Sequence, residues 1–284
     1  MFEEDPIANL QVCLGMVPQH CNACGDFHIS VAVRRTAPTM VGMDFDGDDY
    51  VELLGKAISH RRDRGLPLTI LIAGAADTAI YALVLKAAVR VGGEEMARRL
   101  DVTIIDLCET PLEMCRKYAD HHRLSLSTAR SDLGDFQPDR RFGLIAMHGV
   151  LPFFPQTRRL EYLQRIGSWL DDEGRLVSAV QINEDDKTKE SEAQIGKRLG
   201  LLDEFIANYP EVAAVDVDDI RSRMRRAIAI RRSYPRLFAD LDHLTAFHTA
   251  ANLDIVEQRT VEIAGDLSKR YKQRAVLMCQ AAKG

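Results

Sequence analysis

Two acidic side chains and one histidine occur where apolar stretches of this sequence end. Asp106 follows the mostly apolar residues 102–105, and His148 follows residues 143–147. A third polar group, Asp132, comes shortly after a weaker apolar stretch. Carboxylates accept hydrogen bonds from hydroxyl and amino groups, and a histidine can contact a reacting group or exchange a proton. Polar groups at the ends of neighbouring parallel strands are typical of a nucleotide-binding site.

A small-residue turn precedes these groups in the chain. The apolar residues 68–73 end in Gly74, which two alanines follow. Such residues leave the backbone open to a ligand, and a helix over residues 79–91 would add its N-terminal N–H groups. Strand, small-residue turn, helix, strand and acid together make half of a nucleotide-binding α/β sheet.

Strands and helices alternate along the chain to position these groups. Strands are expected at residues 68–73, 102–105, 124–129, 143–147, 175–182, 253–256 and 275–280, and helices at 79–91, 156–170 and 238–251. This alternation predicts right-handed βαβ units and a largely parallel sheet. Residues 1–64 are expected to be mainly helical, with Asp49 as the N-cap of a helix over residues 50–62.

Composition and charge narrow the functional class. The chain has 284 residues, of which 46% are hydrophobic, so it is long enough for a complete α/β domain. A formal net charge of −5 argues against nucleic-acid binding, which usually needs a basic surface. The first residues are acidic and no apolar stretch is long enough for a membrane span, so neither a signal peptide nor a membrane partner is expected. Six thinly spread cysteines then indicate a reduced, cytoplasmic protein.

With these elements in place, the chain resembles the class I S-adenosylmethionine-dependent methyltransferases. The resemblance covers residues 68–182 and, more loosely, residues 238–280. It rests on four positions in order, which are the turn 73–77, Asp106, Asp132 and the turn 170–176. It implies a Rossmann-like, mostly parallel seven-stranded α/β sheet with a final antiparallel strand. An N-terminal helical cap (1–64) would precede the methyltransferase-like domain (65–284), and a helical insertion would lie at about 184–235.

The resemblance also implies which residues bind S-adenosylmethionine. The expected cofactor-binding residues are Gly74, Ala75, Ala76, Asp77, Asp106, Leu107, Asp132, Leu133 and His148. Asp106 would accept hydrogen bonds from the ribose hydroxyls, and Asp132 from the adenine amino group. His148 is the catalytic candidate, because it lies where the acceptor is expected. The alternatives are a solvated acid at position 106, an Asx-turn residue at 132 and a loop-bonded histidine at 148.

The small-residue turn departs from the family pattern. The family usually has three glycines there and an acid two positions before the first, whereas this chain has Ile72 in the acid's place and keeps only Gly74. A positive φ angle would be costly at Ala76, because alanine carries a Cβ atom. The departure leaves open a member of the fold that does not bind the cofactor.

Four residues near the N-terminus raise the question of a metal. His20, Cys21, Cys24 and His28 contain a CxxC pair with a histidine four residues later, a composition that can bind zinc. If this segment is one helix, however, positions 21, 24 and 28 share its apolar face, and buried cysteines explain the pattern. We therefore expect no metal site.

Two charged segments have similar alternatives. The aspartates at positions 44, 46, 48 and 49 resemble a calcium loop but lack its glycine and glutamate positions, so a solvated turn is expected. The arginine-rich residues 221–232 could bind an acidic acceptor or a phosphate. The more common explanation is one polar helix face with acidic neighbours.

The most favoured function is S-adenosylmethionine-dependent methyl transfer to a small-molecule acceptor by in-line displacement. One alternative is an NAD(P)-dependent oxidoreductase, since Gly74-x-Ala76-x-x-Ala79 is distantly similar to GxGxxG, although no convincing Tyr-x-x-x-Lys pair accompanies it. Another is a non-catalytic S-adenosylmethionine-binding or assembly protein on the same fold. The oligomeric state is left open, with a homodimer among the alternatives.

Overall fold

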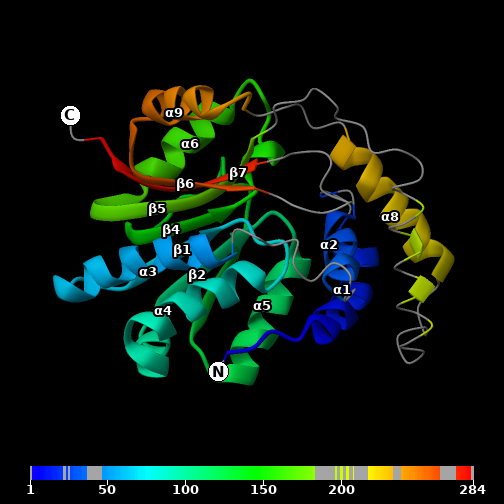
Figure 1. Ribbon diagram of the computed structural model, residues 1–284. Helices are drawn as coiled ribbons and strands as arrows, with labels where there is room; N and C mark the ends of the chain where they lie inside the picture. Colours follow the sequence, from blue (N-terminus) through cyan, green and yellow to red (C-terminus); the bar gives the residue numbers. More distant parts are fainter. Residues whose placement is uncertain are drawn as a thin grey trace.

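The chain forms a sheet covered by helices on both faces, with a further group of helices at one end (Figure 1). The computed structural model describes residues 2–21, 24, 26–36, 47–182, 196, 199–200, 203–204, 207, 217–232, 238–262 and 273–282. Before residue 64, where mainly helical structure is expected, the described residues form α1 (Pro6–His20), α2 (Phe27–Thr36) and α3 (Gly47–Asp63).

Seven strands form one sheet in the order β3-β2-β1-β4-β5-β7-β6. Their bounds are β1 (Thr69–Ala73), β2 (Asp101–Asp106), β3 (Leu126–Arg130), β4 (Phe142–His148), β5 (Leu170–Ile182), β6 (Leu253–Glu262) and β7 (Gln273–Ala281). β1 to β5 pair in parallel, and β7 is antiparallel to both of its neighbours. The predicted fold class, with its antiparallel final strand, is therefore confirmed.

Alternate residues of the central strand, β1, pack into two separate hydrophobic cores. Ile70 and Ile72 pack under α3, α4 (Ala79–Arg98) and α5 (Glu109–His122). Leu71 and Ala73 face the opposite layer, which contains α6 (Arg159–Ser168) and α9 (Leu241–Ala250). All four side chains are buried, which explains why the strand is an uninterrupted apolar stretch rather than an alternating one.

A third core joins the N-terminal helices to α8 (Val217–Arg232), which lies in the predicted insertion. Leu10 and Val17 of α1, Ile29 of α2 and Met224 of α8 are buried together there. In Figure 1 these three helices lie together beside the sheet. The division of the chain at residue 64 stays a prediction. The packing of α3 on the sheet favours an earlier boundary, before Gly47.

Several predicted element ends are wrong in detail. Helix α3 begins at Gly47, so Asp49 lies inside its first turn, where it pairs with Arg259 instead of capping the helix. The expected turn at 170–176 is an irregularity within β5, with a register shift where the strand pairs with β4. The glycines at 92 and 93 break α4 locally, but the helix resumes to Arg98. Positions 44 and 46 of the suspected calcium loop lie outside the described residues.

One ion pair, between a buried arginine and a partly exposed aspartate, fastens α3 to the sheet. The guanidinium of Arg61 is 2% exposed and donates to both carboxylate oxygens of Asp171, at 3.0 and 2.8 Å. Its Nε also donates to the carbonyl oxygen of Pro67 at 2.7 Å. Gly143 lies against this guanidinium, and a Cβ atom there would overlap it. The side chain is thus held by three hydrogen bonds in a fitted space.

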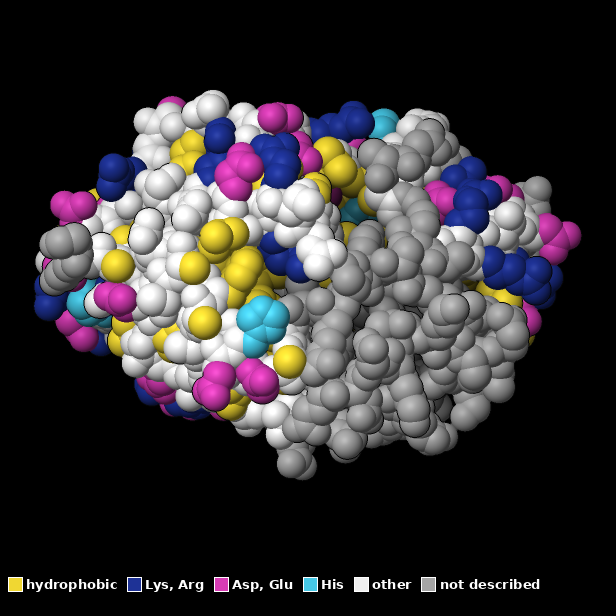
Figure 2. Space-filling view, turned by 90° about the horizontal axis from the view of Figure 1, so that it is seen from above, with side chains coloured by type: hydrophobic (Ala, Val, Ile, Leu, Met, Phe, Trp, Pro, Cys, Tyr) yellow, Lys and Arg dark blue, Asp and Glu magenta, His cyan; other side chains and the backbone are white. Residues whose placement is uncertain are grey.

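Surface charges are mixed in sign. On the face shown in Figure 2, the described Lys and Arg side chains lie among Asp and Glu side chains. Arg259 illustrates the pattern, because it bonds to Glu52 and Glu257 as well as to Asp49. Within the described part of the chain, no helix has the length and apolar character needed to cross a membrane.

Candidate functional site

A cleft of about 240 Å³ opens at the carboxyl ends of the first four strands. Eight of the nine predicted cofactor-binding residues line it, namely Gly74, Ala75, Ala76, Asp106, Leu107, Asp132, Leu133 and His148. The ninth, Asp77, lines an adjoining cleft of about 310 Å³. Gly74, Ala76 and His148 border both clefts, so the two spaces meet at the turn after β1.

The turn after β1 needs glycine at one position only. Gly74 has a φ of +84°, and a Cβ atom there would lie 2.9 Å from Cγ2 of Val150. Its N–H donates to the carbonyl oxygen of Ile105 at 2.9 Å, which holds the turn against β2. Ala76 is not among the residues with positive φ, so the expected cost of alanine at that position does not arise. The loss of two family glycines is therefore compatible with the turn.

Asp106 closes the other side of the turn. Its Oδ2 accepts the N–H of Ala75 at 3.0 Å, and its Oδ1 accepts the N–H of Cys108 at 2.7 Å. Burial raises the pKa of Asp106, while these N–H groups and nearby His28 oppose the rise. The side chain is thus not a freely solvated acid, but a carboxylate held in place with lone pairs remaining on both oxygens.

Asp132 follows β3 and forms the Asx turn, while its predicted contact with adenine stays a prediction. Its Oδ1 accepts the N–H of Gly134 at 2.6 Å, which is the Asx turn of the alternative hypothesis. The same oxygen accepts the hydroxyl of Tyr162 at 2.9 Å. Burial and this hydrogen bond raise the pKa of Tyr162, so the phenol remains a donor. Among the described residues, Oδ2 of Asp132 has no hydrogen-bond donor, which leaves it available to a ligand.

His148 is the last residue of β4 and borders both clefts. Its ring meets the ring of Tyr50 edge-on, with 5.4 Å between the centroids. Tyr50 is buried in α3 and donates from its hydroxyl to the carbonyl oxygen of Val177 at 3.3 Å. The histidine is therefore placed by a fixed aromatic neighbour at the junction of the two spaces.

Asp77 serves the structure of the turn more than the first cleft. It is buried, its Oδ1 accepts the N–H of Ala79 at 2.8 Å, and its Oδ2 lies 3.0 Å from Nε of Arg35. Arg35 also pairs with Glu4 at 2.6 Å. These ion pairs dock the first residues of the chain and α2 onto the start of α4, and they line the second cleft with charge.

Sequence reasoning missed the aromatic wall of the first cleft. Phe27 of α2 meets Phe153 edge-on at a centroid distance of 4.9 Å, and Phe154 stacks at a tilt on Tyr162 at 4.6 Å. All four line the cleft. Phe153 and Phe154 come shortly after β4, a strand that ends at the site, and this position was a usable signal in the sequence. The sequence gives no such signal for Phe27, because its contact partner, Phe153, lies 126 residues later in the chain.

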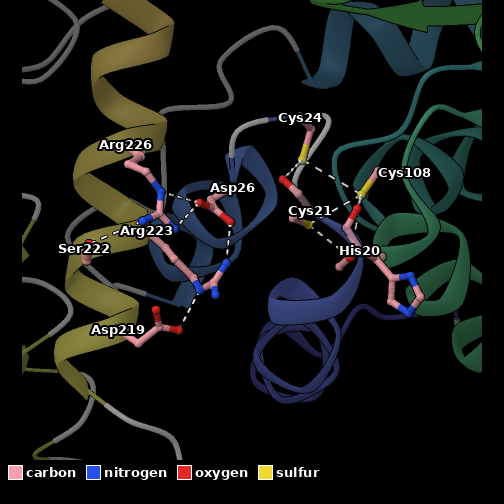
Figure 3. A network of polar contacts seen from close by, with 10 residues as sticks. His20, Cys21, Cys24, Asp26, Cys108, Asp219, Ser222, Arg223 and Arg226 are labelled. Atoms are coloured by element: carbon pink, nitrogen blue, oxygen red, sulfur yellow. Dashed lines mark hydrogen bonds and ion pairs between the residues drawn. The ribbon is translucent and has the colours of Figure 1, made fainter.

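The thiols near the N-terminus do not lie on one helix. Helix α1 ends at His20, Cys21 is its C-cap, and α2 begins only at Phe27. Cys21, Cys24 and His28 instead meet Cys108, the N-cap of α5. His20 takes part through its backbone oxygen, which accepts the Cys108 thiol at 3.2 Å, and Figure 3 shows its ring pointing away. The prediction of one continuous helix face is wrong here.

The arginines of α8 pair with acids. Arg223 and Arg226 bind the two carboxylate oxygens of Asp26, at 2.9 and 2.8 Å. Figure 3 shows the three side chains pointing toward one another. Asp26 is 3% exposed and has a φ of 61°. Arg223 also bonds to Asp219 at 2.6 Å, and Arg221 to Asp218 at 3.2 Å. The polar helix face with acidic neighbours is thus the explanation that the geometry supports.

Comparisons with known proteins identify the fold. No family model and no curated protein matches the sequence. Among solved structures, Burkholderia thailandensis 1,6-didemethyltoxoflavin-N1-methyltransferase, with bound 1,6-didemethyltoxoflavin and S-adenosylhomocysteine, matches with a TM-score of 0.50. It is 17% identical, over 90% of this chain and 91% of that chain.

A second similar structure is the N-methyltransferase NodS from Bradyrhizobium japonicum WM9, in complex with S-adenosyl-l-homocysteine. It is 14% identical, over 82% of this chain and 87% of that chain, with a TM-score of 0.48. An S-adenosylmethionine-dependent methyltransferase from Clostridium acetobutylicum ATCC 824 is 9% identical, over 82% and 92%, with a TM-score of 0.47. With its seven strands in the order described above, this chain has the fold of the S-adenosylmethionine-dependent methyltransferases.

Proposed function

We propose that the chain transfers the methyl group of S-adenosylmethionine to a small-molecule acceptor by in-line displacement. The observation that carries this proposal is the grouping of Gly74, Asp106, Asp132 and His148 around one cleft. Open α/β sheets bind their ligands in this position, beyond the carboxyl ends of the strands. The toxoflavin methyltransferase, which has the same fold, was solved with S-adenosylhomocysteine and a small-molecule substrate bound.

The residues around the first cleft suit an adenosine group. Asp106 keeps one lone pair on each oxygen beyond its two backbone hydrogen bonds, which matches a pair of neighbouring ribose hydroxyls. Oδ2 of Asp132 can accept from an amino group. Leu107, which is 45% exposed, and the buried Leu133 offer apolar surface for a flat ring. These acceptors and apolar contacts are of the kinds that an adenosine group requires, which supports the proposal.

The second cleft suits the acceptor. Arg35, Lys86 and Asp48 line it, so it favours a polar molecule. When bound, S-adenosylmethionine supplies an already activated methyl group on a sulfonium sulfur. The protein then needs mainly to align the acceptor and exclude water. His148 stands where the two spaces meet, so we expect it to contact the acceptor and, where the acceptor must lose a proton, to take it.

Isothermal titration of the full chain with S-adenosylmethionine, S-adenosylhomocysteine and NADH tests the proposal. We expect the first two to bind and NADH not to bind. Asp106→Asn should weaken binding of both roughly 10- to 100-fold, since hydrogen bonds to a charged group contribute about 1.5–3 kcal/mol. Asparagine keeps one oxygen acceptor for the turn, so it disturbs the fold less than alanine does.

Asp101→Asn is the matched control, because Asp101 begins the same strand and lies at its opposite end. This variant should bind the cofactor as the wild type does. Equal affinity of wild type and folded Asp106→Asn would refute the ribose contact. Binding of NADH alone would favour the oxidoreductase, although β7 lies antiparallel where a dinucleotide fold has parallel strands. Binding of none of the three would favour a non-catalytic protein.

A further inference from the structure

Three thiols and one imidazole meet beside the cofactor cleft. The Sγ atoms of Cys21, Cys24 and Cys108 and a ring nitrogen of His28 all lie within 4.8 Å of one another. Figure 3 shows the three cysteines close together between the end of α1 and the loop after β2. We propose that these four side chains bind one Zn²⁺ ion.

The sulfur atoms are spaced as ligands of one metal ion are. Sγ of Cys108 lies 3.5 Å from Sγ of Cys21 and 3.9 Å from Sγ of Cys24. A tetrahedral zinc ion with Zn–S bonds of about 2.3 Å holds its sulfur ligands about 3.8 Å apart. A disulfide would bring two of these atoms to about 2.05 Å, and all three cysteines are free. The cluster therefore needs only small adjustments to close around a metal.

The imidazole of His28 is oriented like that of a metal ligand. Its Nδ1 lies 2.9 Å from the carbonyl oxygen of Ala76. A carbonyl oxygen can only accept, so Nδ1 carries a proton and Nε2 is the ring nitrogen left to bind a metal. Histidine ligands of metals usually donate their other ring N–H in this way, which fixes their tautomer and orientation. The same hydrogen bond ties the cluster to the turn after β1.

The types of ligand indicate the metal and the kind of site. Three thiolates and one imidazole are soft or intermediate ligands, which favour Zn²⁺ and disfavour Mg²⁺ and Ca²⁺. Cys21 and Cys24 have the C-x₂-C spacing that is common in structural zinc sites, and Cys108 supplies a distant ligand. Four protein ligands leave no open position for a substrate, so the ion has a structural role.

Such an ion would fasten the N-terminal helices to the loop that follows β2. Cys24 and His28 line the first cleft, and Cys108 donates its N–H to Asp106 at 2.7 Å. One metal ligand, Cys108, and the candidate ribose-binding carboxylate of Asp106 thus lie on the same loop. Zinc would stabilise the docking of α1 and α2 and hold this wall of the cleft in shape. The metal site itself does not depend on the proposed methyl transfer.

Metal analysis of the full chain tests the proposal. Protein produced in zinc-containing medium and purified under reducing conditions should contain one zinc ion per chain, as measured by inductively coupled plasma mass spectrometry. Cys24→Ser and Cys108→Ser should lower this content to near zero. Cys13→Ser should keep it, because Cys13 is buried in the same helical core but lies outside the cluster. Metal-free wild type titrated with Co²⁺ should develop the visible bands of tetrahedral, thiolate-bound cobalt.

His28→Cys keeps the test decisive where the serine variants fail to fold. Its four thiolates should still bind Co²⁺, with a stronger sulfur-to-cobalt charge-transfer band than the wild type. The proposal is overturned by a folded wild type that holds no zinc and gives no cobalt spectrum. Zinc retained in folded Cys24→Ser and Cys108→Ser, or a disulfide between Cys108 and either other cysteine, would overturn it too. None of these measurements uses S-adenosylmethionine, so they stand apart from the test of methyl transfer.

Discussion

The carboxylate of Asp106 accepts the backbone N–H of Ala75 at 3.0 Å, across the ends of two neighbouring strands. This hydrogen bond joins the acid expected to bind ribose to the turn expected to hold the rest of the cofactor. A ligand that bonds to the acid therefore also meets a turn whose backbone is already fixed. The proposed cofactor site is thus ordered before a ligand arrives, which would lower the cost of binding.

Gly74→Ala should both destabilise the protein and impair the cofactor site. A positive φ costs an alanine roughly 1–2 kcal/mol, and the overlap with Val150 adds about 1–3 kcal/mol. Urea unfolding of the variant should show a loss of free energy of unfolding equal to the sum of these two costs. Isothermal titration should show weaker binding of S-adenosylhomocysteine. Gly65→Ala is the control, because Gly65 has a φ of +66° with no atom near its absent Cβ. The overlap with Val150 would be unimportant if the two variants lost equal stability.

Arg61→Met should lower the free energy of unfolding by about 2 kcal/mol, because it removes the hydrogen bonds that the buried guanidinium makes to Asp171 and to the carbonyl oxygen of Pro67. Denaturant unfolding followed by circular dichroism measures the change. Arg62→Met, at an adjacent arginine that is 41% exposed, should change stability by less than about 1 kcal/mol. A loss in Arg61→Met no larger than in this control would contradict the structural role of the pair.

His248 should make the protein less stable in mild acid. It is fully buried in α9, its Nδ1 donates to the carbonyl oxygen of Leu244 at 2.9 Å, and Nε2 has no hydrogen-bond partner in the described chain. Burial lowers its pKa below the usual value of about 6.5. The unfolded chain therefore takes up a proton first, so this contribution is present above about pH 6.5 and is lost as the pH falls below it.

Unfolding of His248→Leu between pH 5 and pH 8 measures this contribution. Its stability should fall less between pH 7 and pH 5 than that of the wild type. His243→Gln is the control, because His243 lies on the same helix but is exposed. This control should keep the pH dependence of the wild type. An unchanged pH dependence in His248→Leu would mean that another group causes the loss in acid.

Asp26→Asn should loosen α8 from α2. The variant keeps the side-chain shape and tolerates the positive φ, but it removes the charge that Arg223 and Arg226 share. We expect a loss of about 2 kcal/mol and faster hydrogen exchange in peptides from α8. Asp218→Asn, whose side chain is 91% exposed, should leave exchange unchanged. Equal exchange in the Asp26 variant and the wild type would show that apolar packing around Met224 holds the helix alone.

Much of the fold could be predicted because its signals are local. The strands that end at Ala73, Asp106 and His148 are rich in apolar residues, and the expected site residues lie at or shortly after strand ends. A parallel sheet brings such ends together whatever the loops do, so the cleft was predictable in outline. The position of Asp77 was not, because its ion pair with Arg35 depends on how the N-terminal helices dock.

Features that depend on distant contacts were hidden in the sequence. Cys108 follows Cys21 by 87 residues, and no periodic pattern connects it with the CxxC pair. The sequence also indicates only weakly that α1 ends at His20, because the residues around this position are compatible with a continuing helix. Arg61 resembles a surface residue at the end of a helix, and only the space beside Gly143 shows that it is buried. Such features require the tertiary structure.

The placement of β7 between β5 and β6 has a consequence for synthesis on the ribosome. β6 pairs with β7 and has no ladder to β5, so it stays unattached to the sheet until residues 273–281 have been translated. Until then the outer edge of β5 is an open template for pairing with other chains. We therefore expect nascent chains that stall before β7 to be aggregation-prone and to depend on chaperones, even though the strands that carry the candidate site are already complete.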